Sequence, residues 1–104
     1  MMAMGAVGVI SVLGNLCPEW MKSLVDAALE GDCRTAMQYH RKVHDLAAGL
    51  GRLGTNPVPI KTAMAVSGLL GEEFRLPLCP LAEEGREAVR RLLRRHELLG
   101  NGTD

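Results

Sequence analysis

Only one segment of this chain favours a β-strand, and every later segment favours helix. Residues 7–13 form a short apolar run rich in β-branched side chains, and a run that is apolar on both faces is typical of a buried strand in a parallel sheet. Such a strand must pair its backbone groups along both edges. No second strand is predicted. Either a partner supplies the neighbouring strands or the chain is a piece of something larger, and the sequence favours the second alternative.

Periodic apolar positions predict four helices, over residues 18–30, 32–50, 60–70 and 82–99. Pro18 suits the first position of a helix, and Asp32 can cap the second one. Gly71 should stop the third helix before a proline-containing loop over residues 72–81. The last helix has acidic residues at its start, arginines in its later turns and Gly100 after it, in agreement with the helix dipole.

The composition excludes several classes of partner. The 104 residues carry 12 basic and 12 acidic side chains, and nucleic acid and anionic membranes both need a basic surface. The uncharged first 18 residues lack the basic flank of a signal peptide, and glycines and Pro18 interrupt them before they reach the length of a membrane span. Three cysteines without CxxC spacing argue against a disulfide framework and favour a reducing compartment. We therefore expect a cytoplasmic protein that binds neither nucleic acid nor membrane.

No set of residues completes a metal or nucleophile site. His40 and His44 are four residues apart, with Cys33 and Met37 on nearly the same stripe, but no carboxylate on that stripe completes a zinc site. We interpret them as residues that border a buried helix face. The dipole of the following helix could lower the pKa of Cys17, but burial as a small apolar side chain is favoured.

Two further features argue against a functional site in this chain: the charge pattern of the last helix and the absence of known motifs. Glu83, Glu84 and Glu87 lie three or four residues from Arg86, Arg90 and Arg91, which favours an ion-paired, solvated face over a nucleic-acid site. The sequence contains no glycine-rich nucleotide-binding motif and no serine elbow around Ser11. We therefore predict no catalytic residue, no metal and no cofactor within this chain.

Three stretches, taken together and in order, resemble one family. They are residues 5–12 with Asn15, residues 56–61 (Asn-Pro-Val-Pro-Ile-Lys) and residues 75–81 (Arg-Leu-Pro-Leu-Cys-Pro-Leu). They resemble the G-G-x-G-V-I-S-V…N, N-P-[IV]-P-[IV]-K and R-L-P-L-x-P-L motifs of the dihydrodipicolinate synthase / N-acetylneuraminate lyase family. The likeness is greatest to the synthases that condense pyruvate with L-aspartate-4-semialdehyde in lysine and diaminopimelate biosynthesis. Ala6 departs from the family's second glycine, and Ala82 stands where a helix-capping serine or aspartate is common.

The resemblance implies a C-terminal portion of a (β/α)8 TIM barrel. A whole barrel takes about 250 residues, so we expect a mainly α chain with one N-terminal β-strand. Residues 1–31 would be the last β/α unit of the barrel, and residues 32–104 the C-terminal helical region. The methionine-rich start runs straight into the strand motif, so we expect a truncated or partial member of the family.

The resemblance also implies a chemistry. Members are lyases that hold pyruvate as a Schiff base on a lysine, and that lysine, a tyrosine proton relay and a threonine pair would all lie upstream of this segment. The resemblance assigns that role to none of Lys22, Lys42 and Lys61, and we expect this chain alone to be inactive. Ile10 matches an isoleucine whose backbone lies against the bound pyruvate, a role possible only in an intact barrel.

An alternative function needs no barrel. The chain could be a small helical interaction module that self-associates through its orphan strand. Because an isolated chain would leave that apolar strand uncovered, we expect a homo-oligomer or an aggregation-prone protein.

Overall fold

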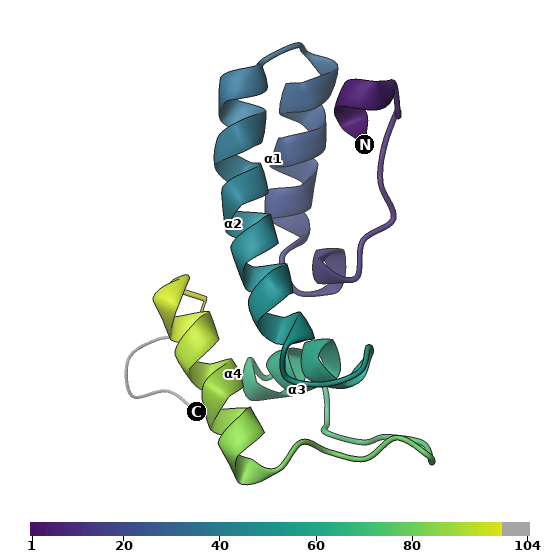
Figure 1. The fold of residues 1–104 in the computed structure, drawn as a ribbon, viewed down its shortest axis with the longest axis vertical. Helices are drawn as coiled ribbons and strands as arrows, with labels where there is room; N and C mark the ends of the chain where they lie inside the picture. Colours follow the sequence, from purple (N-terminus) through teal and green to yellow (C-terminus); the bar gives the residue numbers. More distant parts are fainter. Residues whose placement is uncertain (99–104) are drawn as a thin grey trace. The chain divides into compact units, whose positions relative to one another are not determined.

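The structure is a computed structural model that describes residues 1–98, and those residues form helices and loops without a β-strand (Figure 1). The elements are two short 3-10 helices and four α-helices: η1 (Met2–Met4), η2 (Leu13–Asn15), α1 (Pro18–Leu29), α2 (Cys33–Gly51), α3 (Val58–Val66) and α4 (Glu83–Arg95). The chain divides into two compact units, residues 1–45 and 46–104, with the division inside α2. None of the described helices is long and apolar enough to cross a membrane. The boundary predicted after residue 31 concerns an intact barrel and stays a prediction.

The strand predicted over residues 7–13 is wrong. Residues 6–11, which we call the extended segment, form neither helix nor strand, and no backbone hydrogen bond joins them to any other described residue, because no second strand lies beside them. Val12 already has helical angles, with φ −59° and ψ −47°. The end of the predicted strand turns into η2, where the Ser11 hydroxyl accepts a hydrogen bond from the Gly14 amide at 3.2 Å. A hydroxyl bond of this kind offers the backbone a turn in place of a sheet ladder.

Helices α1 and α2 form the body of the first unit, together with the segment before them. Pro18 opens α1 as predicted, and the glycine between the helices, Gly31, adopts a left-handed φ of 81°. Asp32 caps α2 as predicted, since its carboxylate accepts a hydrogen bond from the Thr35 amide at 3.1 Å. The Lys42 ammonium of α2 lies 5.5 Å from the centre of the Trp20 ring of α1, in agreement with the side-by-side course of the two helices in Figure 1.

The second unit has the larger core. Its buried side chains come from the end of α2, from α3 and from α4: Leu46, Leu50, Val58, Ile60, Ala63, Val66, Val89, Leu92 and Leu93. The buried hydroxyl of Thr62 donates a hydrogen bond to the Val58 carbonyl at 2.8 Å. This core is almost purely aliphatic, as a chain with 3% aromatic residues requires.

Two helix ends differ from the sequence-based expectations. Helix α3 begins at Val58, because a proline in the first turn gives up only an amide that has no helical partner. It ends before Gly68, whose φ is 82°, and not at Gly71. Helix α4 ends at Arg95, where Glu97 adopts a left-handed φ of 60° in the place usually taken by glycine. The helix end predicted at residue 99, Gly100 and the tail after it lie outside the described residues.

The loop after α3 is held at both of its ends. The Lys61 ammonium donates a hydrogen bond to the Glu73 carbonyl at 2.6 Å and lies 4.8 Å from the centre of the Phe74 ring. A salt bridge of 3.1 Å joins Glu72 to Arg86 of α4. At the far end, Leu81 packs so closely on Gly54 and Gly85 that added Cβ atoms would lie 3.3 and 3.2 Å from its side chain.

Candidate functional site

Ile10, the only residue to which the sequence assigned a substrate contact, lies on the extended segment of the first unit. Its side chain is fully exposed, and its neighbours Val7 and Val12 are also exposed. The segment runs alongside α1 between η1 and η2 (Figure 1). The structure therefore shows where Ile10 lies, whereas its contact with pyruvate stays a prediction.

Each lysine of the chain already makes a structural contact. Lys22 forms a 2.6 Å salt bridge with Asp26, and the hydrogen bond and charge of that carboxylate raise the pKa of Lys22. Lys42 lies over the rings of Trp20 and Tyr39, and Lys61 anchors the loop described above. A Schiff-base lysine needs an amine that loses its proton readily, which burial or a nearby cation provides. For Lys22 the neighbouring carboxylate has the opposite effect.

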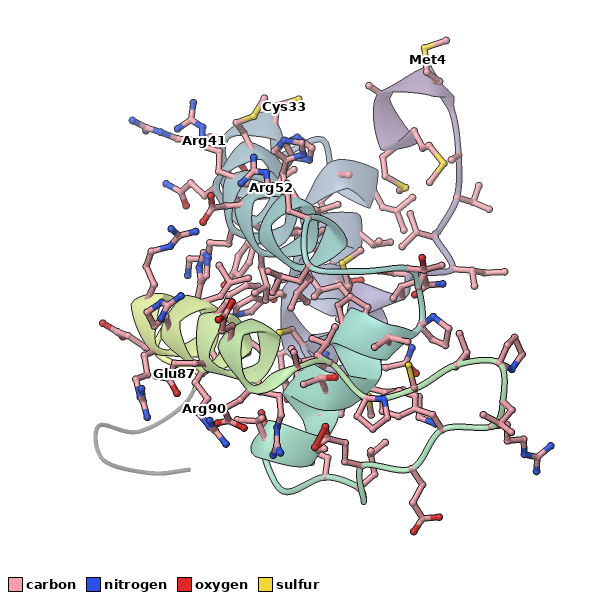
Figure 2. All side chains as sticks on the ribbon, turned by 60° about the horizontal axis from the view of Figure 1, so that its bottom comes forward. Met4, Cys33, Arg41, Arg52, Glu87 and Arg90 are labelled. Carbon is pink, nitrogen blue, oxygen red and sulfur yellow. The ribbon has the colours of Figure 1, made fainter. Side chains whose placement is uncertain are left out.

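The histidine and cysteine candidates do not form a site either. The rings of His40 and His44 stack with their centroids 5.8 Å apart, and Cys33 is exposed at the start of α2 (Figure 2). Within residues 1–98 no three His, Cys, Asp or Glu side chains lie close enough together to hold a metal ion. Cys17 is buried as predicted, and burial raises its pKa to about 11, so it is a thiol and not a thiolate at neutral pH.

Arg86 and Arg90 of α4 are ion-paired as predicted, although Arg86 has a different partner, whereas the described residues show no salt bridge of Arg91, the third arginine that was predicted to pair. Arg90 bonds Glu83 at 3.3 Å and Glu87 at 3.2 Å, and these hydrogen bonds raise its pKa. Arg94 lies 3.7 Å from Glu87, and Arg86 pairs with Glu72 of the preceding loop. Glu87 and Arg90 are labelled in Figure 2. The pairing of Arg86 across the loop is a tertiary contact that helix spacing could not reveal.

The sequence analysis missed an apolar groove in the first unit. We call it the methionine groove; it has a volume of about 460 Å³ and is lined by the N-terminal residues, Val9 and residues of α1 and α2, among them Met21, Leu24, Met37 and Val43. Helical periodicity identifies the apolar stripe of α1. It cannot show how much of that stripe the rest of the chain leaves uncovered. Ile10 is not among the lining residues.

Comparison with known proteins places the chain in a family. The family model described as "Dihydrodipicolinate synthetase family" matches residues 1–96. The chain belongs to the dihydrodipicolinate synthetase family. This confirms the resemblance drawn from the three sequence motifs.

Relatives and solved structures agree with that membership. The chain is 46% identical over 98 residues to the 4-hydroxy-tetrahydrodipicolinate synthase of Aquifex aeolicus, a match that covers 94% of this chain and 33% of the relative. It superposes on the crystal structure of dihydrodipicolinate synthase from Aquifex aeolicus with a TM-score of 0.86 and 44% identity, covering 93% of this chain and 33% of that one. The chloride-inhibited dihydrodipicolinate synthase of Acinetobacter baumannii, solved with pyruvate, gives a TM-score of 0.86 at 35% identity, with 94% and 33% covered. The chain therefore spans about a third of the length of these relatives.

Proposed function

We propose that this chain forms the C-terminal third of a pyruvate-dependent Schiff-base lyase, in which pyruvate condenses with L-aspartate-4-semialdehyde in lysine and diaminopimelate biosynthesis. The observation that carries the proposal is the extent of the match, because nearly all of this chain corresponds to only a third of a 4-hydroxy-tetrahydrodipicolinate synthase. The proposed setting is the cytoplasm, where pyruvate and the aldehyde would be the small-molecule partners.

The extended segment is the part that would join the barrel. Its backbone groups are unpaired and its side chains are apolar, which is what a strand buried between two others in a parallel sheet requires. In that position the Ile10 backbone would lie at the barrel mouth against pyruvate, since active sites of such barrels form at the carboxyl ends of the strands. Residues 1–31 would complete the barrel, and residues 32–104 would form the helical region after it.

By itself the 104-residue chain is proposed to be inactive. The resemblance places the Schiff-base lysine upstream, and the three lysines present are engaged with Asp26, with aromatic rings and with the Glu73 carbonyl. The Asp26 carboxylate raises the pKa of Lys22, which is opposite to what a Schiff-base amine requires. The chain therefore lacks the nucleophile that would hold pyruvate.

A chimera tests the proposal directly. The C-terminal third of the Aquifex aeolicus synthase is replaced by this chain, and condensation of pyruvate with L-aspartate-4-semialdehyde is measured together with borohydride trapping of labelled pyruvate. We expect an active chimera whose label lies on a lysine of the Aquifex portion, and no label on the 104-residue chain alone. A folded but inactive chimera, or a labelled Lys22, Lys42 or Lys61, would contradict the proposal. The variant Leu76→Ala serves as a control, because this exposed loop residue should leave activity unchanged.

A further inference from the structure

The methionine groove is lined by soft metal ligands as well as by aliphatic side chains. All of its lining residues belong to the first unit, and none of them has a charged side chain. Those that carry a sulfur atom or an imidazole are Met1, Met2, Met21, Cys33, Met37 and His40. Thioether, thiolate and imidazole donors favour Cu(I), whereas Mg²⁺ and Ca²⁺ prefer carboxylate and carbonyl oxygens.

Methionine sulfur changes what the groove can bind. Within residues 1–98, His, Cys, Asp and Glu side chains by themselves form no metal site. The expectation that this chain binds no metal rested on the same side chains, which are the ligands of zinc. The thioethers supply donors that zinc does not use and that Cu(I) does.

We propose that the methionine groove binds one Cu(I) ion through the sulfur atoms of Met21 and Met37 and the imidazole of His40. Met37 and His40 are three residues apart on α2, so their side chains are neighbours on one face of the helix. Both residues line the groove, and both are exposed, Met37 to 49%. An ion can therefore reach this pair of donors from solution.

Met21 supplies the third donor from α1. The Lys42 ammonium lies 5.5 Å from the centre of the Trp20 ring, so residue 20 of α1 is about level with residue 42 of the antiparallel α2 (Figure 1). Met21 follows Trp20 and therefore lies within about one helical turn of His40 along the helix pair. Because Met21 lines the same groove, two helices present three soft donors to one space.

The neutral ligand set favours a monovalent ion. The cost of removing an ion from water rises with the square of its charge, and a divalent ion in this groove would have no carboxylate beside it to offset that cost. Cys33 lies one turn before Met37 and lines the same groove, but the proposed set does not require it. This inference concerns the chain on its own and does not rest on the proposed function.

Nuclear magnetic resonance of the methionine methyl groups tests the site. The full chain carries Cys33→Ser and Cys79→Ser, so that its two exposed thiols do not compete, and is titrated without oxygen with Cu(I) kept reduced by ascorbate. We expect one equivalent of Cu(I) to shift the methyl signals of Met21 and Met37. Met4, which is 90% exposed, and Met64 of α3 lie outside the groove, so their signals should not move.

Matched variants identify the ligands by competition with a chromogenic Cu(I) chelator. Met37→Leu, which nearly conserves volume and helix propensity, and His40→Gln should each lower the Cu(I) affinity at least about 10-fold. His44→Gln is the control, because His44 is exposed on the same helix but does not line the groove. Circular dichroism confirms that each variant is folded.

Four results would each overturn the proposal. They are no Cu(I) binding at about 100 μM, equal shifts at Met4 and Met64, an affinity loss in His44→Gln equal to that in His40→Gln, and Zn²⁺ bound as tightly as Cu(I). Equal shifts at every methionine would mean that exposed thioethers bind the ion without a built site.

Discussion

Gly49 lies where the end of α2 packs on α4, and its replacement by alanine tests that packing. A Cβ at this position would lie 2.7 and 2.9 Å from the two methyl carbons of Leu92, which is buried. Alanine gains about 0.5–1 kcal/mol over glycine inside a helix. Forcing a packed leucine out of its place costs about 1–3 kcal/mol. We therefore expect Gly49→Ala to destabilise the second unit by about 1 kcal/mol, against its helix propensity.

Gly51 provides the matched control on the same helix. An added Cβ there has no atom within 4 Å, so Gly51→Ala should stabilise the chain by about 0.5 kcal/mol. Urea unfolding followed by circular dichroism measures both variants. A change of 1 kcal/mol corresponds to a shift of about 0.3–1 M in the urea midpoint.

A double-mutant cycle separates the contact with Leu92 from other effects. Leu92→Ala alone should cost about 2–5 kcal/mol, and adding Gly49→Ala to it should then be neutral or stabilising, because the clash has gone. If Gly49→Ala stabilises the chain as much as Gly51→Ala does, α2 and α4 do not pack as described.

Three further predictions follow from single side chains. Iodoacetamide at neutral pH should modify exposed Cys33 much faster than Cys17, whose pKa is raised to about 11 by burial; equal rates in mass spectrometry would refute this. Hydrogen bonds from Thr35 lower the pKa of Asp32, so the stabilisation that its carboxylate gives to α2 is complete above the ordinary pKa of 3.8 and is lost as the pH falls through the lower folded pKa. Asp32→Asn should therefore lose less helicity than the unmodified chain on acidification. Identical acid titrations of the two proteins, followed by circular dichroism, would exclude the effect. Lys61→Met should speed tryptic cleavage after Arg75 by releasing the loop, and an unchanged cleavage rate would show that the anchor is dispensable.

Local signals were sufficient to predict the helices. Pro18 and Asp32 act on backbone groups within one turn of themselves, so their effects can be read from neighbouring residues. The end of α4 was misplaced because the left-handed residue is Glu97, and a non-glycine residue of this kind rarely adopts that conformation, so the sequence contains no stop signal there.

The N-terminal segment shows where local reasoning ends. Its β-branched residues predict a strand, whereas residues 6–11 form no regular element and Val12 already has helical φ and ψ. A β-strand, however, forms only by pairing with a second extended segment, and residues 7–13 cannot provide that second segment. The candidate site was limited for the same reason: the three motifs identify the family, but the pocket that Ile10 would line is built by residues that the motifs do not contain.

The doubly anchored loop marks a position where the chain can be opened without loss of structure. Lys61 and Arg86 hold residues 72–74, and Leu81 is fixed between Gly54 and Gly85. The exposed tip around Leu76 between them is closed by its own turn, in which the Leu78 amide donates a hydrogen bond to the Arg75 carbonyl at 3.0 Å. An affinity tag or a new chain terminus inserted there would leave the core of the second unit undisturbed. Such a handle would let the chain be immobilised on a column through a site that lies outside the aliphatic core of the second unit.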